Sequence, residues 1–102
     1  MDAQLKKGML DGCVLAILSR KDSYGYELTG DAKQILDVSE SSLYPVLRRL
    51  EATGQLITYD VPHNGRLRRY YKLSDTGRQR LIEFRNELID TKKVIDFIMG
   101  EE

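Results

Sequence analysis

Tryptophan is absent from the 102-residue sequence, and cysteine and histidine occur once each, as Cys13 and His63. A single cysteine excludes an internal disulfide and cannot build a cysteine-based zinc site alone. The sequence also lacks the glycine-rich phosphate-binding motifs of the Walker and Rossmann types. Because a chain of this size can hardly build a deep, dry pocket, we expect no enzymatic activity, no catalytic residues, no metal and no cofactor.

Long hydrophobic runs are missing as well. The longest apolar run spans residues 13–18, whereas a helix that crosses a bilayer needs roughly 20 apolar residues. The first eight residues lack the basic start and the long apolar centre of a signal peptide. The length allows one domain with at most one appendage. We therefore expect a cytoplasmic protein that does not associate with membranes.

A net charge is lacking too, since 16 Lys and Arg residues balance 16 Asp and Glu residues. The two signs are unevenly distributed along the chain. Residues 41–80 contain eight basic and three acidic side chains, a charge of +5, which leaves −5 for the remainder. A basic segment on a neutral-to-acidic body is typical of nucleic-acid binding, although ordinary solvated arginines would give the same count.

Three helices are predicted in the first half of the chain, because apolar residues recur there at three- and four-residue steps. They cover residues 5–18, 24–36 and 40–53. Pro45 would disrupt a helix interior, so the third helix must begin within residues 39–42, and Gly54 ends it.

The same spacing predicts which sides of these helices face inward. On the second helix the inward residues are Leu28, Ala32, Ile35 and Leu36, and Ser23 is expected to cap its start. On the third helix they are Leu43, Val46, Leu47 and Leu50. The opposite face of the third helix then carries Ser41, Pro45 and Arg48, flanked by Ser42, Tyr44 and Arg49.

Two strands follow, over residues 55–61 and 67–74, and Asn64 and Gly65 between them are a strong turn signal. Alternation places Arg66, Arg68, Tyr70 and Lys72 on one side and Leu67, Arg69, Tyr71 and Leu73 on the other. We expect the second set, which holds the apolar residues, to pack on the helices. Arg66 and Arg68 lie nearest the turn and are the better candidates for phosphate contacts.

A last helix of about 37 Å is predicted to begin within residues 74–77 and to end near residue 99. A seam of three- and four-residue steps runs along it, as in a heptad pattern: Leu81, Phe84, Leu88, Thr91, Ile95 and Ile98. A domain of this size cannot cover such a length on one side. Part of the seam is therefore predicted to bury against a second copy, with Leu81, Phe84, Leu88, Ile95 and Ile98 as dimerisation residues.

Three helices followed by a hairpin is the order of elements in a winged helix-turn-helix domain. The predicted fold is therefore mainly α (α+β), with this domain over residues 1–75 and a dimerisation helix over residues 76–102. In this architecture the third helix enters the DNA major groove and the hairpin, or wing, lies against the backbone. Other roles stay open for the exposed residues: Ser41 and Ser42 could be helix caps, Tyr44 a packing residue and Arg49 the partner of an acid.

Three segments of the sequence resemble motifs of the PadR family of bacterial transcriptional regulators. They are YGYEL at residues 24–28, SLYPVLRRLE at residues 42–51 followed by Gly54, and GRLRRYYKLS at residues 65–74 followed by Gly77. Their order and separations match over nearly the whole chain. The resemblance implies a homodimeric DNA-binding repressor whose final helix builds the dimer interface. It also implies that Tyr24 and Tyr44 lie near the DNA backbone.

The resemblance places the chain among the short members of the family, which have a single terminal helix. Some of these bind flat aromatic drugs between tryptophans on that helix, but this sequence has none and is aliphatic at the matching seam position, near Leu88. Other members respond to phenolic acids, to which no residue here commits the chain. A small-molecule effector is thus a candidate partner of unknown identity.

These features predict a sequence-specific transcriptional regulator, a repressor that acts as a homodimer on a pseudo-palindromic operator in double-stranded DNA. Arg48 with Ser41 and Ser42 would read or orient at the groove, and Tyr24, Tyr44, Arg66 and Arg68 would hold phosphates. Two other classes stay open. A protein-interaction module would bind DNA weakly and without salt dependence. A ligand-binding sensor would need convergent polar groups on the last helix, where the seam has only Thr91.

Overall fold

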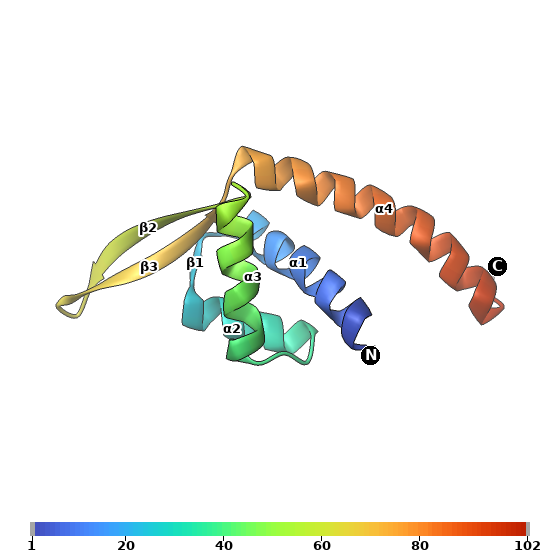
Figure 1. The fold of residues 1–102 in the computed structure, drawn as a ribbon, viewed down its shortest axis with the longest axis horizontal. Coiled ribbons are helices and arrows are strands. Elements are labelled where there is room, and N and C mark those ends of the chain that lie inside the picture. Colours follow the sequence, from blue (N-terminus) through green and yellow to red (C-terminus); the bar gives the residue numbers. More distant parts are fainter. Residues whose placement is uncertain (1, 102) are drawn as a thin grey trace.

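Seven elements make up the fold in a computed structural model, which describes residues 2–101. They are α1 (Ala3–Arg20), β1 (Ser23–Tyr24), α2 (Gly25–Ile35), α3 (Glu40–Ala52), β2 (Leu56–His63), β3 (Arg66–Leu73) and α4 (Asp75–Met99). Helices α1 to α3 form a body, from which the β2–β3 hairpin projects to one side and α4 to the other (Figure 1). The predicted winged helix-turn-helix with a long terminal helix is confirmed, and element ends differ from prediction by at most two residues.

Buried apolar side chains of α1, α2, α3 and the base of the sheet form one core, to which α4 adds Leu81. On α3 the buried residues are those that the spacing predicted: Leu43, Val46, Leu47 and Leu50. On α2 the prediction is wrong for Ile35, which is 62% exposed. The helix ends at Ile35, and the extended backbone after it turns Leu36 and Val38 into the core instead.

The sheet has the strand order β1-β3-β2, and both strand pairs are antiparallel. The two-residue strand β1 was not expected, and it pairs Ser23 with Tyr71 and Tyr24 with Tyr70. This pairing turns Ser23 inward, where its side chain is fully buried. The expectation that Ser23 caps α2 is therefore wrong, because Tyr24 occupies the N-cap position and makes no side-chain capping bond.

The hairpin closes through a two-residue turn at Asn64 and Gly65, whose φ angles are 51° and 77°. Positive φ at both positions defines the tight turn that Asn-Gly favours between antiparallel strands. Pro62 and His63 extend β2 further toward the turn than predicted. Because β2 lies at an edge of the sheet, a proline without an amide N–H is tolerated there.

Only the first part of α4 lies on the body. Ser74 caps the helix by accepting a hydrogen bond from the Gly77 amide at 3.0 Å. A Cβ at Gly12 of α1 would overlap the Phe84 ring, so glycine lets α1 and α4 approach closely there. The helix then continues away from α1 (Figure 1). Its distal part, residues 89–99, exposes the apolar side chains of Ile89, Val94, Ile95, Phe97, Ile98 and Met99.

Candidate nucleic-acid interface

One face of α3 is exposed and carries the residues predicted to meet DNA. Ser41, Ser42, Pro45 and Arg48 all lie on it. Within residues 2–101, the Arg48 guanidinium forms no ion pair with a carboxylate. Its charge and its five N–H donors are therefore free for a phosphate or a base edge.

The neighbouring Arg49 is held within the protein. Its Nη2 donates to Asp11 Oδ1 of α1 at 2.6 Å, and this hydrogen bond raises the pKa of Arg49. Arg49 thus links α3 to α1, the structural role that the sequence had left open for it. Two adjacent arginines of one helix therefore differ in availability, and Arg49 is the matched control for Arg48.

The first turn of α3 concentrates hydroxyl groups. Ser39 caps the helix by accepting from the Ser42 amide at 3.2 Å. The Ser39 Oγ also lies 2.9 Å from Ser41 Oγ and 3.1 Å from Ser42 Oγ. Ser41 and Ser42 are thus not the cap, and they remain exposed beside backbone amides at a helix start, where an anion is favoured.

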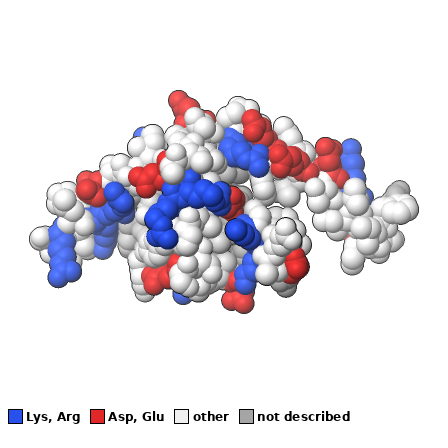
Figure 2. Space-filling view, in the orientation of Figure 1, with Lys and Arg blue, Asp and Glu red and all other residues white. Residues whose placement is uncertain are grey.

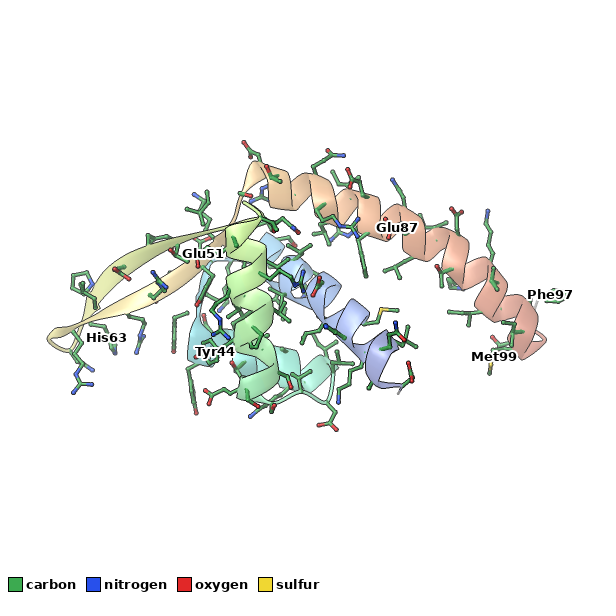
Figure 3. All side chains as sticks on the ribbon, in the orientation of Figure 1. Tyr44, Glu51, His63, Glu87, Phe97 and Met99 are labelled. Atoms are coloured by element: carbon green, nitrogen blue, oxygen red, sulfur yellow. The ribbon has the colours of Figure 1, made fainter. Side chains whose placement is uncertain are left out.

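Tyr44 extends from α3 toward the start of α2 (Figure 3). A Cβ at residue 25 would lie 2.7 Å from Tyr44 Oη, so glycine at that position gives the hydroxyl access to the first turn of α2. The side chain is half-buried and packs against the core. Tyr44 therefore combines the packing role with a hydroxyl placed beside the N-terminus of α2.

The hairpin has two different faces. Arg66, Arg68, Tyr70 and Lys72 share one face as predicted, together with Tyr59, Val61 and His63 of β2. On the other face Tyr71 and Leu73 are buried against the helices, whereas Leu67 is 68% exposed. The expectation that Leu67 also packs on the helices is wrong, because the strands extend beyond the core before they turn.

Basic side chains mark the outer part of the hairpin. His63 lies beside the turn (Figure 3), the strand register places Arg66 opposite it, and both side chains are exposed. Neither Arg66 nor Arg68 forms an ion pair with a carboxylate of the described residues. Figure 2 shows Lys and Arg side chains on the hairpin and over the middle of the body, whereas both signs alternate along α4.

Arg68 and Tyr24, which the sequence assigned separately to phosphates, lie together in the structure. The guanidinium carbon of Arg68 is 4.0 Å from the centroid of the Tyr24 ring. Both side chains are half-buried, and Tyr24 directly precedes α2. A cation over a tyrosine face is attracted by the ring quadrupole. These two residues therefore act as one unit rather than as two independent contacts.

Neither a metal-binding cluster nor a reactive thiol is found among residues 2–101. These residues contain no group of three His, Cys, Asp or Glu side chains that could hold a metal ion. Cys13 is half-buried on α1, and burial raises the pKa of its thiol, which disfavours the reactive thiolate. Within the same residues, no helix combines the length and the apolar character needed to cross a membrane.

The fold and the basic face agree with a known family. The family model described as "Transcriptional regulator PadR-like family" matches residues 14–83. The chain belongs to the PadR-like family. The matched range of this PadR-like protein begins in α1 and ends in α4, so it contains every residue assigned to DNA contact.

Relatives of this PadR-like protein cover half of its length or more. An uncharacterized protein from Lysinibacillus sphaericus is 32% identical over 99 residues, which is 91% of this chain and 90% of the relative. The transcriptional regulator Rv3488 from Mycobacterium tuberculosis is 45% identical over 51 residues, 50% of this chain and 48% of that protein. The crystal structure of a PadR-like transcriptional regulator from Bacillus cereus has 31% identity and a TM-score of 0.86, covering 98% of this chain and 100% of that one. The chain is accordingly a transcriptional regulator.

Two residues on the hairpin side of this PadR-like protein were not identified from sequence. Tyr59 Oη of β2 donates to Asp22 Oδ2, in the loop before β1, at 2.6 Å. This hydrogen bond raises the pKa of Tyr59 to about 12. Strand alternation places Tyr59 on the face of Tyr70 once the register is known, but 37 residues separate Tyr59 from Asp22, and no local pattern signals their contact.

Proposed function

We propose that this PadR-like protein is a transcriptional repressor without enzymatic activity, which binds a pseudo-palindromic operator in double-stranded DNA as a homodimer in the cytoplasm. The proposal depends on one observation: exposed basic side chains lie on two elements of the same body, helix α3 and the β2–β3 hairpin. The free Arg48 lies on α3, and Arg66 and Arg68 lie on the hairpin. This is the arrangement with which a winged helix places one helix in the major groove and its wing on the backbone.

Sequence readout is assigned to α3. Arg48 can bond a guanine edge through two parallel N–H groups or hold a phosphate, and Ser41 and Ser42 can bond base edges or phosphates. The N-terminal amides of the helix add favourable interaction with an anion. The exposed Arg48 supports this assignment, because no ion pair with a carboxylate of residues 2–101 must be broken before DNA is bound.

Backbone contacts are assigned to Tyr24, Tyr44, Arg66 and Arg68. Tyr44 Oη lies beside the first turn of α2, where unpaired amides attract anions. Tyr24 and Arg68 lie in contact just before that turn, and Arg66 extends the positive charge to the end of the hairpin. Contacts of this kind fix the register of a protein on DNA without reading its sequence.

The homodimer is assigned to α4. Of the five predicted dimerisation residues, Leu81 is buried and Phe84 and Leu88 are half-buried within the chain, whereas Ile95 is 47% and Ile98 is 74% exposed. A second copy that covers the distal seam would remove these side chains from water. Its two-fold axis would then set two copies of α3 about 34 Å apart, in successive major grooves.

A small-molecule effector would act on this dimer. Because the spacing of the two half-sites is fixed by the angle between the subunits, a ligand that favours a different angle would weaken operator binding. The absence of tryptophan from the sequence argues against the tryptophan sandwich for flat aromatic drugs.

Fluorescence anisotropy across a salt series tests the proposal, with DNA from just upstream of the protein's own gene and random DNA of equal length. We expect selective binding that falls steeply with salt. Arg48→Ala should abolish the selectivity, whereas Arg49→Ala, its matched control, should preserve it. The double variant Arg66→Ala/Arg68→Ala should weaken binding to all sequences alike and reduce the salt slope by about 2.

Two outcomes would contradict parts of this proposal. If the protein binds the upstream DNA no better than random DNA, it does not regulate its own gene, and selection of operators from genomic fragments follows. If it binds no DNA even at low salt, the repressor assignment itself is wrong. A protein-interaction module would then be the better description, and a partner protein would be sought.

A further inference from the structure

Three tyrosines, one from each strand, form a row across the sheet on the face that carries Arg68. The strand register places Tyr24 opposite Tyr70, and Tyr70 opposite Tyr59. The rings of Tyr59 and Tyr70 are stacked, with centroids 5.5 Å apart and planes 10° apart. Tyr24 meets Tyr70 edge to face, also at 5.5 Å and with planes 68° apart. Both geometries are favourable for aromatic pairs.

A polar contact holds each end of this tyrosine row. At one end, the Tyr59 hydroxyl donates to Asp22 at 2.6 Å, which fastens the hairpin to the loop that follows α1. At the other end, the Arg68 guanidinium lies over the Tyr24 ring at 4.0 Å. The row therefore connects the body of the protein to one arginine of the hairpin through four consecutive contacts.

Arg68 is ordered by this arrangement in a way that Arg66 is not. Arg66 lies two residues nearer the turn, is exposed, and has no aromatic ring beneath its guanidinium among the described residues. A free arginine loses rotamer freedom when it binds a phosphate, and that loss lowers affinity. An arginine already fixed on a ring loses less, because its orientation is set before binding.

We propose that Tyr70 and Tyr59 are positioning residues of the DNA-binding surface, which fix the Tyr24 ring and through it the orientation of the Arg68 guanidinium. The inference rests on the proposed DNA-binding function. Tyr70 and Tyr59 contribute to affinity only through the unit of Tyr24 and Arg68, and this restriction distinguishes positioning from a general effect on stability or from direct contact with DNA.

The first test needs no DNA. In the ¹⁵N-labelled protein, ring currents of Tyr24 should shift the Arg68 Nε–Hε resonance upfield. Tyr70→Phe retains the ring and should leave this shift unchanged, whereas Tyr70→Leu removes the ring and should move the resonance toward that of Arg66. An unchanged Arg68 resonance in Tyr70→Leu would overturn the proposal, whether or not the protein binds DNA.

The second test is a pair of double-mutant cycles on operator DNA. Tyr70→Leu should weaken binding about fivefold, the size expected when a cation–π contact is lost. On a Tyr24→Phe/Arg68→Ala background, which lacks the hydroxyl and the guanidinium of this unit, it should have no further effect, whereas on an Arg66→Ala background the fivefold loss should persist. An equal loss on both backgrounds would overturn the positioning role alone. If the wild-type protein binds no DNA, the proposed function fails, and the positioning role fails with it.

A milder variant keeps the test valid should Tyr70→Leu not fold, which circular dichroism would reveal. Tyr59→Phe preserves the stacked ring and removes only the hydrogen bond to Asp22. It should weaken operator binding about twofold in the wild-type background, since one exposed hydrogen bond contributes little. On the Tyr24→Phe/Arg68→Ala background it should have no effect, and a twofold loss there would contradict the proposal.

Discussion

The hairpin and the distal part of α4 both extend from the same body in different directions (Figure 1), but they are stabilised in different ways. The hairpin is fixed by contacts within the chain: the tyrosine row, and the bond from Tyr59 to Asp22. The distal part of α4 ends in apolar side chains such as Phe97 and Met99 (Figure 3), which residues 2–101 leave mostly exposed.

The difference indicates what each extension is built to meet. Apart from the exposed Leu67, the end of the hairpin carries mainly basic and polar side chains, which stay hydrated until a phosphate replaces the water, so the chain itself must supply its rigidity. The apolar seam of α4 gains free energy only when a second apolar surface covers it. One extension therefore suits a charged, non-protein partner, and the other suits a second copy of the chain.

The largest effect is expected from charges placed in the distal seam. Ile95→Asp combined with Ile98→Asp should convert the dimer into a monomer, because carboxylates cannot be buried unpaired in an apolar interface. Operator affinity should then fall by about a hundredfold or more, since two linked half-sites gain that much from avidity. Analytical ultracentrifugation gives the mass, and fluorescence anisotropy gives the affinity.

The control also introduces two aspartates, but on another side of the helix. Asn86→Asp combined with Lys93→Asp changes exposed residues away from the seam and should leave the dimer intact. A wild-type mass for the seam variant would contradict the dimer assignment. It would also remove the contrast between the two extensions, because the distal part of α4 would then be exposed in solution.

A smaller effect is expected from the two phenylalanines of α4. Phe84→Ala should lower the free energy of unfolding by about 2 kcal/mol, because the ring is half-buried against Gly12. Phe97→Ala should change it by less than about 0.5 kcal/mol, because that ring is 71% exposed. Urea denaturation in the monomeric Ile95→Asp/Ile98→Asp background separates these values from dimerisation. If both variants lose the same free energy of unfolding, the distal part of α4 packs on the body of its own chain, as the first part does.

Sequence periodicity predicts the elements well because each one repeats an apolar face. The inward residues of α3 and the heptad-like seam of α4 follow directly from three- and four-residue steps. The spacing of the seam does not reveal where α4 leaves the body. Seam residues up to Leu88 are at least half-buried within the chain and those after it are exposed, because the position of α1 decides how much of α4 is covered. Strand β1 has only two residues, too few for any alternating pattern.

The candidate site is predicted as a set of residues but not as a set of contacts. Sequence places Arg48 and Arg49 side by side on α3, yet only the approach of α1 decides that Asp11 pairs with Arg49 and not with Arg48. The stack of Arg68 on Tyr24 requires the β1–β3 pairing. Contacts between residues far apart in sequence are set by packing geometry, which periodicity does not encode.

A modest effect on stability is expected at the turn of the hairpin. Gly65 has φ of +77°, which disfavours any residue with a Cβ, although the space around it is open. Gly65→Ala should therefore lower the free energy of unfolding by about 1 kcal/mol through backbone strain alone. Gly8→Ala is the control, since Gly8 lies in α1 with open space and helical backbone. A loss of similar size at both positions in urea denaturation would contradict the strained turn.

The smallest effect is expected from Tyr59, whose ionisation changes the stability of the fold at high pH and not at neutral pH. Its hydroxyl donates to the Asp22 carboxylate, so the folded state favours the protonated phenol and raises its pKa to about 12. In an unfolded chain a tyrosine pKa lies near 10, so the contribution of this bond is fully present below about pH 10. It is lost as the pH rises through about 12.

A titration of ¹³Cζ-labelled tyrosine by NMR measures this directly. The Tyr59 resonance, assigned by its absence from Tyr59→Phe, should titrate near pH 12 in the wild-type protein. In Asp22→Asn the carboxylate acceptor is gone, and the midpoint should fall toward 10. If Tyr59 of the wild-type protein already titrates near 10, the hairpin is not fastened to the loop before β1. The tyrosine row alone would then hold the hairpin, and the contrast between the two extensions would be smaller.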